Sequence, residues 1–93
     1  MIEVTQARYL GDYRIEITFS TGESGVVDLS TSLWGPVFEP LRASQRQFAR
    51  FTVSPTLHTI TWDNDTDFAP EYLREKMIEQ ANARDGEYAA RDR

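Results

Sequence analysis

The chain has 93 residues with no cysteine, 15 acidic and 10 basic residues, one histidine and a formal net charge of −5. This length fits one small domain, and the missing cysteine excludes a disulfide framework, a thiolate zinc site and a cysteine nucleophile and fits a reducing cytoplasm. No apolar run is long enough to span a membrane, no secretory leader is expected, and an acidic chain repels phosphate backbones, so neither a membrane nor nucleic acid is expected as a partner.

The first third of the chain predicts three antiparallel strands. Apolar and polar residues alternate over residues 2–8 and most regularly over 13–19, which indicates strands with one buried face. Gly11-Asp12 favours a turn between them. A second turn over 20–23 precedes a third strand at 25–29, so the three strands are expected to form a meander.

The middle third is less regular and predicts short helical pieces. Residues 30–32 are expected to cap a helical turn that contains Leu33 and Trp34 and that Gly35-Pro36 stops. The apolar residues of 37–41 are expected to lie under the sheet. Ser44 with Gln47 has the spacing of a capping box, which predicts a helix of about two turns ending near Arg50.

The last third predicts a hairpin, a polar corner and the longest helix. Residues 52–53 and 58–62 are expected to pair as strands, and the Asp and Asn residues of 63–65 then favour a turn. Pro70 suits the first position of a helix. This helix is expected to end near Arg84, since Gly86 favours a stop, with the apolar stripe Leu73, Met77 and Ala81. Residues 1–85 are therefore expected to form the domain, and 86–93 a frayed charged tail.

The run Ile-x-Trp-x-Asn-x-x-Asp-Phe-x-Pro-Glu-x-Leu over Ile60 to Leu73 resembles a bacterial family, the domain of unknown function 2442. Segments 12–23 and 27–41 carry the same resemblance, which covers roughly Ile2 to Tyr72. The chain departs from the family at Asp65, where glycine is usual, and in its C-terminal extension. The resemblance implies a small α+β domain without a settled activity. Members often occur beside small proteins proposed to form toxin–antitoxin pairs, and some carry a separate DNA-binding domain.

The usual catalytic, metal and nucleotide signatures are missing. Counted from Asp63, an EF-hand would need glycine at Phe68 and glutamate at Arg74, so the acidic corner fails that template. His58 has no nucleophile-elbow serine to serve. The glycines stand singly, without a phosphate-binding loop. No catalytic residue, metal site or cofactor is expected, and the chain is not expected to be an enzyme.

Aromatic and basic residues supply the candidate binding residues. The candidate surface consists of Trp34, Phe38, Trp62, Asn64 and Asp67. Trp62 alternates within a strand, which favours the core, whereas burial and exposure both remain open for Trp34. Arg46 and Arg50 are expected to share a helix face, which is either solvated or faces an acidic partner or a phosphate.

These observations together predict an α+β fold, with an antiparallel sheet of four to five strands, a short helix and a longer C-terminal helix packed on it. The expected function is that of a non-enzymatic protein-interaction module in the bacterial cytoplasm, either antitoxin-like or accessory. Its expected partner is a small protein that docks on a strand edge or on the Trp34–Pro40 segment, and a homodimer is also open. The alternative is a small-molecule or metal-binding domain that uses the Trp62–Asp67 corner. A transcription factor is not expected, since the chain leaves no room for an added DNA-binding domain.

Overall fold

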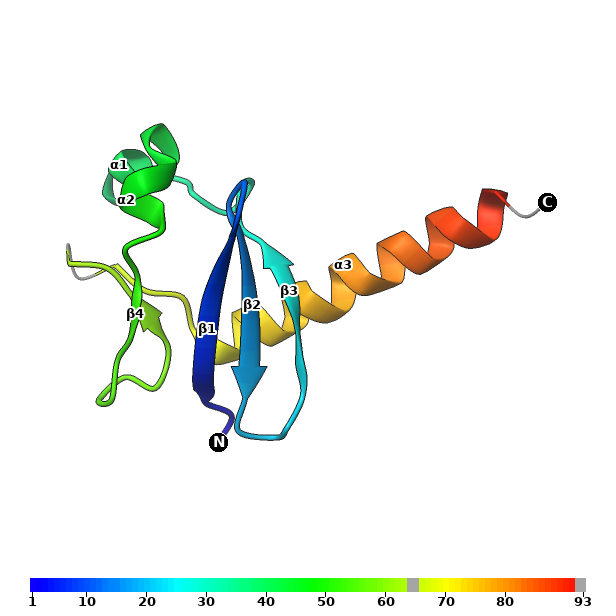
Figure 1. Cartoon of the computed structure of the whole chain (residues 1–93), viewed down its shortest axis with the longest axis horizontal. Helices are drawn as coiled ribbons and strands as arrows, with labels where there is room; N and C mark the ends of the chain where they lie inside the picture. The colour runs from blue at the N-terminus through cyan, green and yellow to red at the C-terminus, as the bar shows by residue number, and fades with distance from the viewer. Residues whose placement is uncertain (64–65, 92–93) are drawn as a thin grey trace.

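An antiparallel meander forms the centre of the molecule. The structure is a computed structural model, which describes the backbone of residues 1–63 and 66–91 and, within these ranges, the side chains as far as residue 83. β1 (Val4–Gly11), β2 (Arg14–Phe19) and β3 (Ser24–Asp28) pair in the order β1-β2-β3 (Figure 1). The predicted three-stranded meander is confirmed. Its inner face carries the fully buried Ile15, Ile17 and Phe19, because alternate side chains of a strand point to one side.

The β1–β2 turn differs from the sequence prediction at Tyr13, which was expected inside the second strand. Asp12 and Tyr13 have φ angles of 54° and 64°, so both central residues of this two-residue turn are left-handed. A tyrosine rarely adopts this conformation, and tertiary contacts hold it here. The Tyr13 hydroxyl donates to the Arg42 carbonyl at 2.6 Å, and its ring meets the Phe48 ring edge-on at 5.0 Å.

The predicted sheet of four to five strands is wrong, because the last two strands form a separate small sheet. β4 (Thr52–Val53) pairs only with β5 (Ile60–Thr61) within the described part of the chain. The hairpin lies beside β1 (Figure 1), and the amide of Val4 donates to the carbonyl of His58 at 2.8 Å. Each of these strands has two residues, and the bond from Val4 reaches the turn between them and neither strand.

The middle segment also differs from its prediction. Residues 33–34 form no helix, and Gly35-Pro36 begins a helical stretch instead of ending one: η1 (Pro36–Phe38) is a 3-10 turn that leads into α1 (Glu39–Ala43). Proline at the first position of a helix loses no hydrogen bond, which accounts for this start. α2 (Gln45–Phe48) has the predicted cap, since the amide of Gln47 donates to the Ser44 hydroxyl at 3.2 Å, but it ends before Arg50.

α3 (Pro70–Arg91) starts at the predicted proline and runs past the predicted stop at Gly86. Glycine costs a helix only about 1 kcal/mol relative to alanine, and the residues around it include good helix formers. The helix crosses one face of the sheet and continues beyond β3 (Figure 1). Leu73 and Met77 are buried against the sheet as predicted, and Gly25 gives the Met77 side chain room to approach β3.

The core lies between this face of the sheet, α3 and the segment that holds α1 and α2. It contains Val4, Ile15, Ile17, Phe19, Val27, Leu29, Leu33, Leu41, Phe48, Ile60, Trp62, Phe68, Leu73 and Met77. None of the helices in the described part of the chain combines the length and the apolar content needed to cross a bilayer. The division into a domain of residues 1–85 and a frayed tail remains a prediction.

Candidate interaction surface

Trp34 projects from the surface between a buried leucine and a glycine. Its side chain is 75% exposed, while the neighbouring Leu33 is 2% exposed. The Leu33 carbonyl accepts a hydrogen bond of 2.8 Å from Nη1 of Arg42. Gly35 has a φ of 84°, a left-handed angle that suits glycine and turns the chain directly after the indole. The exposed indole therefore lies between a residue anchored in the core and a turn at Gly35.

The rest of the Trp34–Pro40 segment divides into an outer and an inner part. Val37 is 57% exposed on the same segment, although it was expected to lie under the sheet. Its position in the short 3-10 turn points it outward, while the next residue turns inward. Phe38 is half-buried, and its ring stacks on Phe68 at 5.0 Å. The segment thus exposes two apolar side chains and is anchored to the core by a third.

Trp62 belongs to the core and not to this surface. It is 6% exposed, and its indole nitrogen donates to the Phe48 carbonyl at 2.8 Å. Its ring meets the rings of Phe48, Phe51 and Phe68 at 5.5, 6.2 and 6.0 Å. The two tryptophans therefore have opposite environments, and the candidate surface predicted from the sequence is not continuous through Trp62.

The corner after Trp62 is closed by backbone bonds. The amide of Trp62 donates to the carbonyl of Thr66 at 3.0 Å, and Thr61 pairs with Asp67 in an isolated antiparallel bridge. The Asp67 side chain is exposed. Asn64 lies outside the described residues. The described part of the corner thus joins the small sheet to α3 through main-chain hydrogen bonding.

The two arginines of the predicted basic face lie on different elements. Arg46 is exposed on α2, whereas Arg50 follows the end of this helix. Arg50 instead lines a small hollow of about 150 Å³. The hollow is enclosed by Pro40, Leu41, Gln47, Arg50, Trp62 and Asp63. The structure therefore places one arginine beside the corner and leaves the other on an open helix surface.

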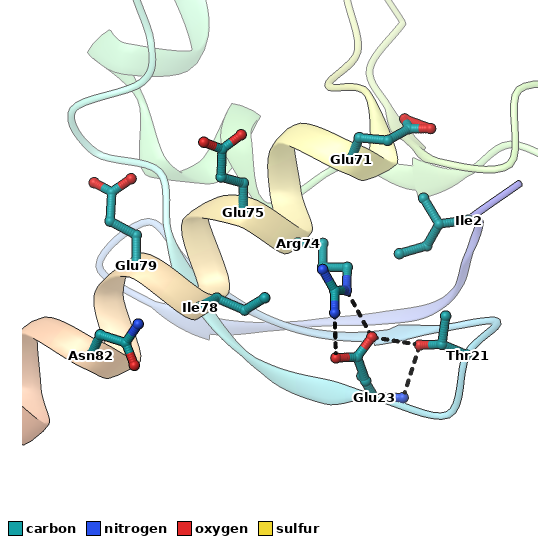
Figure 2. Close-up of a pocket in the computed structure, with 9 residues that line it drawn as sticks. All are labelled: Ile2, Thr21, Glu23, Glu71, Arg74, Glu75, Ile78, Glu79 and Asn82. Atoms are coloured by element: carbon teal, nitrogen blue, oxygen red, sulfur yellow. Dashed lines mark hydrogen bonds and ion pairs between the residues drawn. The ribbon is translucent and has the colours of Figure 1, made fainter.

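A larger groove of about 760 Å³ runs beside the first half of α3. Its α3 side is formed by Glu71, Arg74, Glu75, Ile78, Glu79 and Asn82, and the other side by Ile2, Thr21 and Glu23 (Figure 2). The α3 residues follow i, i+3 and i+4 steps, which defines one helix face. That periodicity could have predicted the α3 side of the groove from the sequence, whereas the opposite side comes from distant parts of the chain.

An ion pair ties the two sides of this groove together. Nε and Nη2 of Arg74 donate to the two carboxylate oxygens of Glu23 at 2.7 and 2.9 Å (Figure 2). The hydrogen bonds from Arg74 and from the Thr21 hydroxyl lower the pKa of Glu23, and the same pair raises the pKa of Arg74. Because the folded-state pKa of Glu23 is depressed, its stabilisation is present at neutral pH and is lost as the pH falls through that pKa.

We expect Glu23→Gln to destabilise the protein at pH 7 and to lose this effect under acidic conditions, where the wild-type carboxyl is also neutral. Urea unfolding of both proteins between pH 7 and pH 3 measures the difference in free energy. In an Arg74→Met background the pH dependence of the difference should shrink, because the dominant partner is gone. A difference that stays constant over the whole range would contradict this role for the ion pair.

Among the residues that the structure describes, no group of three or more His, Asp or Glu side chains gathers closely enough to hold a metal ion. His58, the single histidine of the chain, has its Nε2 atom 3.5 Å from a carboxylate oxygen of Glu3. This contact joins the β4–β5 turn to the start of the chain.

Comparison with family models places these features in a known group of proteins. The model described as "Protein of unknown function (DUF2442)" matches residues 4–79. The chain belongs to this family. The match includes the meander, the Trp34–Pro40 segment, the corner and the first half of α3, so the DUF2442 domain contains both the exposed tryptophan and most of the groove. A comparison with curated proteins finds no match.

A solved structure shares the fold. The crystal structure of the "Putative DNA Binding Protein NE0471" from Nitrosomonas europaea ATCC 19718 superposes with a TM-score of 0.75 at 27% sequence identity. The alignment covers 88% of this chain and 52% of that one. The chain therefore spans about half the length of this neighbour.

Proposed function

We propose that this DUF2442 protein is a non-enzymatic protein-interaction module that docks a small partner protein through Trp34 and Val37. The observation that supports this most strongly is the 75% exposure of Trp34, directly after a residue whose carbonyl is bound by Arg42. Exposed apolar groups on a folded surface often mark interaction sites, and tryptophan is enriched among the residues that dominate binding energy.

The strand edges support the proposal less well than the Trp34–Pro40 segment does. At the outer edge of β3, the amide of Asp28 donates to Oε1 of Gln80, and Nε2 of Gln80 donates to the Asp28 carbonyl, both at 2.9 Å. The Gln80 side chain thereby occupies the groups that an added strand would use at this position. On the other side of the sheet, Val4 is already bonded to His58. Docking by strand addition would have to displace these contacts or avoid them.

The partner we infer is a small protein with an apolar pocket that takes the indole. The family resemblance supports an antitoxin-like or accessory role in the bacterial cytoplasm, where the module would act by covering its partner's surface. Such a role needs no catalytic group. The contact of His58 with Glu3, away from the Trp34–Pro40 segment, is in keeping with a structural role for the single histidine.

Co-expression with the product of the neighbouring gene, followed by size-exclusion chromatography and calorimetry, tests the proposal. Trp34→Ala should weaken the complex by about 2 kcal/mol or more, which is the usual effect of truncating a dominant interface residue. Leu57→Ala is the matched control, since Leu57 is 55% exposed on the separate β4–β5 turn. It should leave the affinity unchanged.

Two results would refute this assignment. One is a chain that elutes alone at every concentration, and the other is a complex that Trp34→Ala leaves as tight as the wild type. A concentration-dependent homodimer that Trp34→Ala dissociates would replace the small partner protein with a second copy of the chain.

A second candidate is small-ligand binding at the hollow beside the corner. The observation in its favour is that a guanidinium and a carboxylate, from Arg50 and Asp63, line this hollow together with Trp62. Its volume of about 150 Å³ is below the usual range for ligand pockets, which start at about 300 Å³. Thermal shift with small anions and divalent metals separates this candidate from the first, because a ligand specific for the folded state raises the melting temperature.

DNA binding is the candidate that the name of the Nitrosomonas protein supports. Against it stands the net charge of −5, which disfavours contact with a phosphate backbone. Fluorescence anisotropy with a duplex oligonucleotide at low salt tests it. Salt-sensitive binding that an Arg46→Ala/Arg50→Ala variant abolishes would establish DNA as a partner and overturn the exclusion drawn from the charge.

A further inference from the structure

The groove beside α3 combines an apolar floor with an acidic rim. Ile78 is the apolar side chain of its α3 side, 37% exposed, and Ile2 faces the groove from the start of the chain. Figure 2 shows Ile78 between the two sides of the groove and Glu71, Glu75 and Glu79 in a row along the outer side of the helix. We propose that this groove binds a cationic amphipathic segment of a partner protein.

The charge of the groove determines the sign of its occupant. Four carboxylates and one guanidinium line it, and this guanidinium, on Arg74, is engaged by Glu23. Of the three remaining glutamates, Glu79 has Lys76 at 3.6 Å. Glu71 and Glu75 take part in no ion pair among the described residues that line the groove. The uncompensated charge is therefore negative, and a segment carrying lysine or arginine complements it.

The spacing of the glutamates matches a helical or extended cationic segment. Positions four apart on a helix are separated by about 6 Å along its axis. Lysines at i and i+4 of a docked helix have the same separation and can meet these glutamates in register. Like charges at i and i+4 on α3 oppose each other slightly, so a bound cation relieves a repulsion that is present in the free protein.

The apolar floor distinguishes this groove from a solvated acidic helix face. A partner residue such as leucine can pack on Ile78, which adds a hydrophobic contribution that salt does not screen. The volume of about 760 Å³ accommodates several side chains. No residue of the Trp34–Pro40 segment lines the groove, so the two surfaces are separate. The proposal for one surface can therefore be refuted while the other stands.

The probe is a fluorescein-labelled amidated peptide of leucine, lysine and alanine, with lysines at i and i+4 and leucines at i and i+3. Fluorescence anisotropy with the full chain should show saturable binding that weakens as salt rises. Glu75→Gln/Glu79→Gln should raise the Kd about fivefold at low ionic strength, in line with the strength of exposed ion pairs. Ile78→Ser should weaken binding at both low and high salt.

Asp12→Asn/Glu16→Gln is the matched control. Like Glu75→Gln/Glu79→Gln, it removes two exposed carboxylates, one of which is paired with a base. Glu16 lies 3.1 Å from Arg8, and Glu79 lies 3.6 Å from Lys76. The control variant should bind the peptide like the wild type, and a peptide with glutamate in place of lysine should not bind. Equal weakening by both double variants would mean that only the net charge attracts the peptide, and no binding at low salt would equally refute the proposal.

Discussion

Phe48→Ala is expected to lower the free energy of unfolding by about 3–5 kcal/mol, the usual cost of removing a buried phenylalanine ring. Phe48 has no exposed surface. Its ring meets Tyr9, Tyr13, Phe51 and Trp62 at 5.8, 5.0, 6.5 and 5.5 Å. One residue of a single-turn helix therefore joins the β1–β2 hairpin to the corner. Since small domains have only about 5–15 kcal/mol of stability, this loss is a large part of the total.

Urea unfolding followed by far-ultraviolet circular dichroism measures the effect. Phe51→Ala is the control, because Phe51 belongs to the same aromatic cluster but is only half-buried. Its ring contacts two rings of the cluster, those of Phe48 and Trp62. Its loss of stability should be clearly smaller. If both variants lost the same amount, the ring of Phe48 would not be the centre of the aromatic cluster.

Features set by neighbours in the sequence were predictable. The alternation of Ile15, Ile17 and Phe19 places them on one face of a strand wherever that strand packs. Ser44 caps a helix through an amide three residues ahead, and Pro70 starts a helix by its own geometry. These predictions depend on local stereochemistry, and the structure confirms them.

Features that depend on distant contacts were not predictable. Tyr13 takes a left-handed conformation because Arg42 and Phe48 hold its side chain, and both lie far along the chain. The two-residue strands β4 and β5 pair with each other and not with the meander, a choice of partner that no local pattern encodes. The groove brings together Ile2, the β2–β3 turn and α3, so the third of its lining residues that lies outside α3 could not be seen from the helix pattern.

The two tryptophans show the same limit on prediction from the sequence, although they are the same residue type. Alternation in a strand favoured burial of Trp62, which the structure confirms. The sequence pattern left the position of Trp34 open, because the turn at Gly35 and the bond from Arg42 to the Leu33 carbonyl are not part of any periodic pattern. An irregular segment has no periodicity from which a buried face can be read.

The same substitution at these two positions is expected to give opposite results. Trp62→Ala should cost about 3–5 kcal/mol of stability, since it removes a buried ring and leaves the Phe48 carbonyl without its donor. Trp34→Ala should change the free energy of unfolding by less than about 0.5 kcal/mol, as exposed substitutions usually do. Trp62→Phe keeps a ring but loses the N–H group, and an intermediate loss of about 1–3 kcal/mol is expected.

Urea titrations of the three variants measure these losses, and the intrinsic fluorescence identifies the environments. The Trp34→Ala variant retains the buried indole and should emit at shorter wavelength than Trp62→Phe, which retains the exposed one. A stability loss at Trp34 comparable to that at Trp62 would show that the indole at position 34 supports the fold. Loss of partner binding in Trp34→Ala could then no longer be attributed to a missing contact. Only a variant that is as stable as the wild type and fails to bind would support Trp34 as a docking residue.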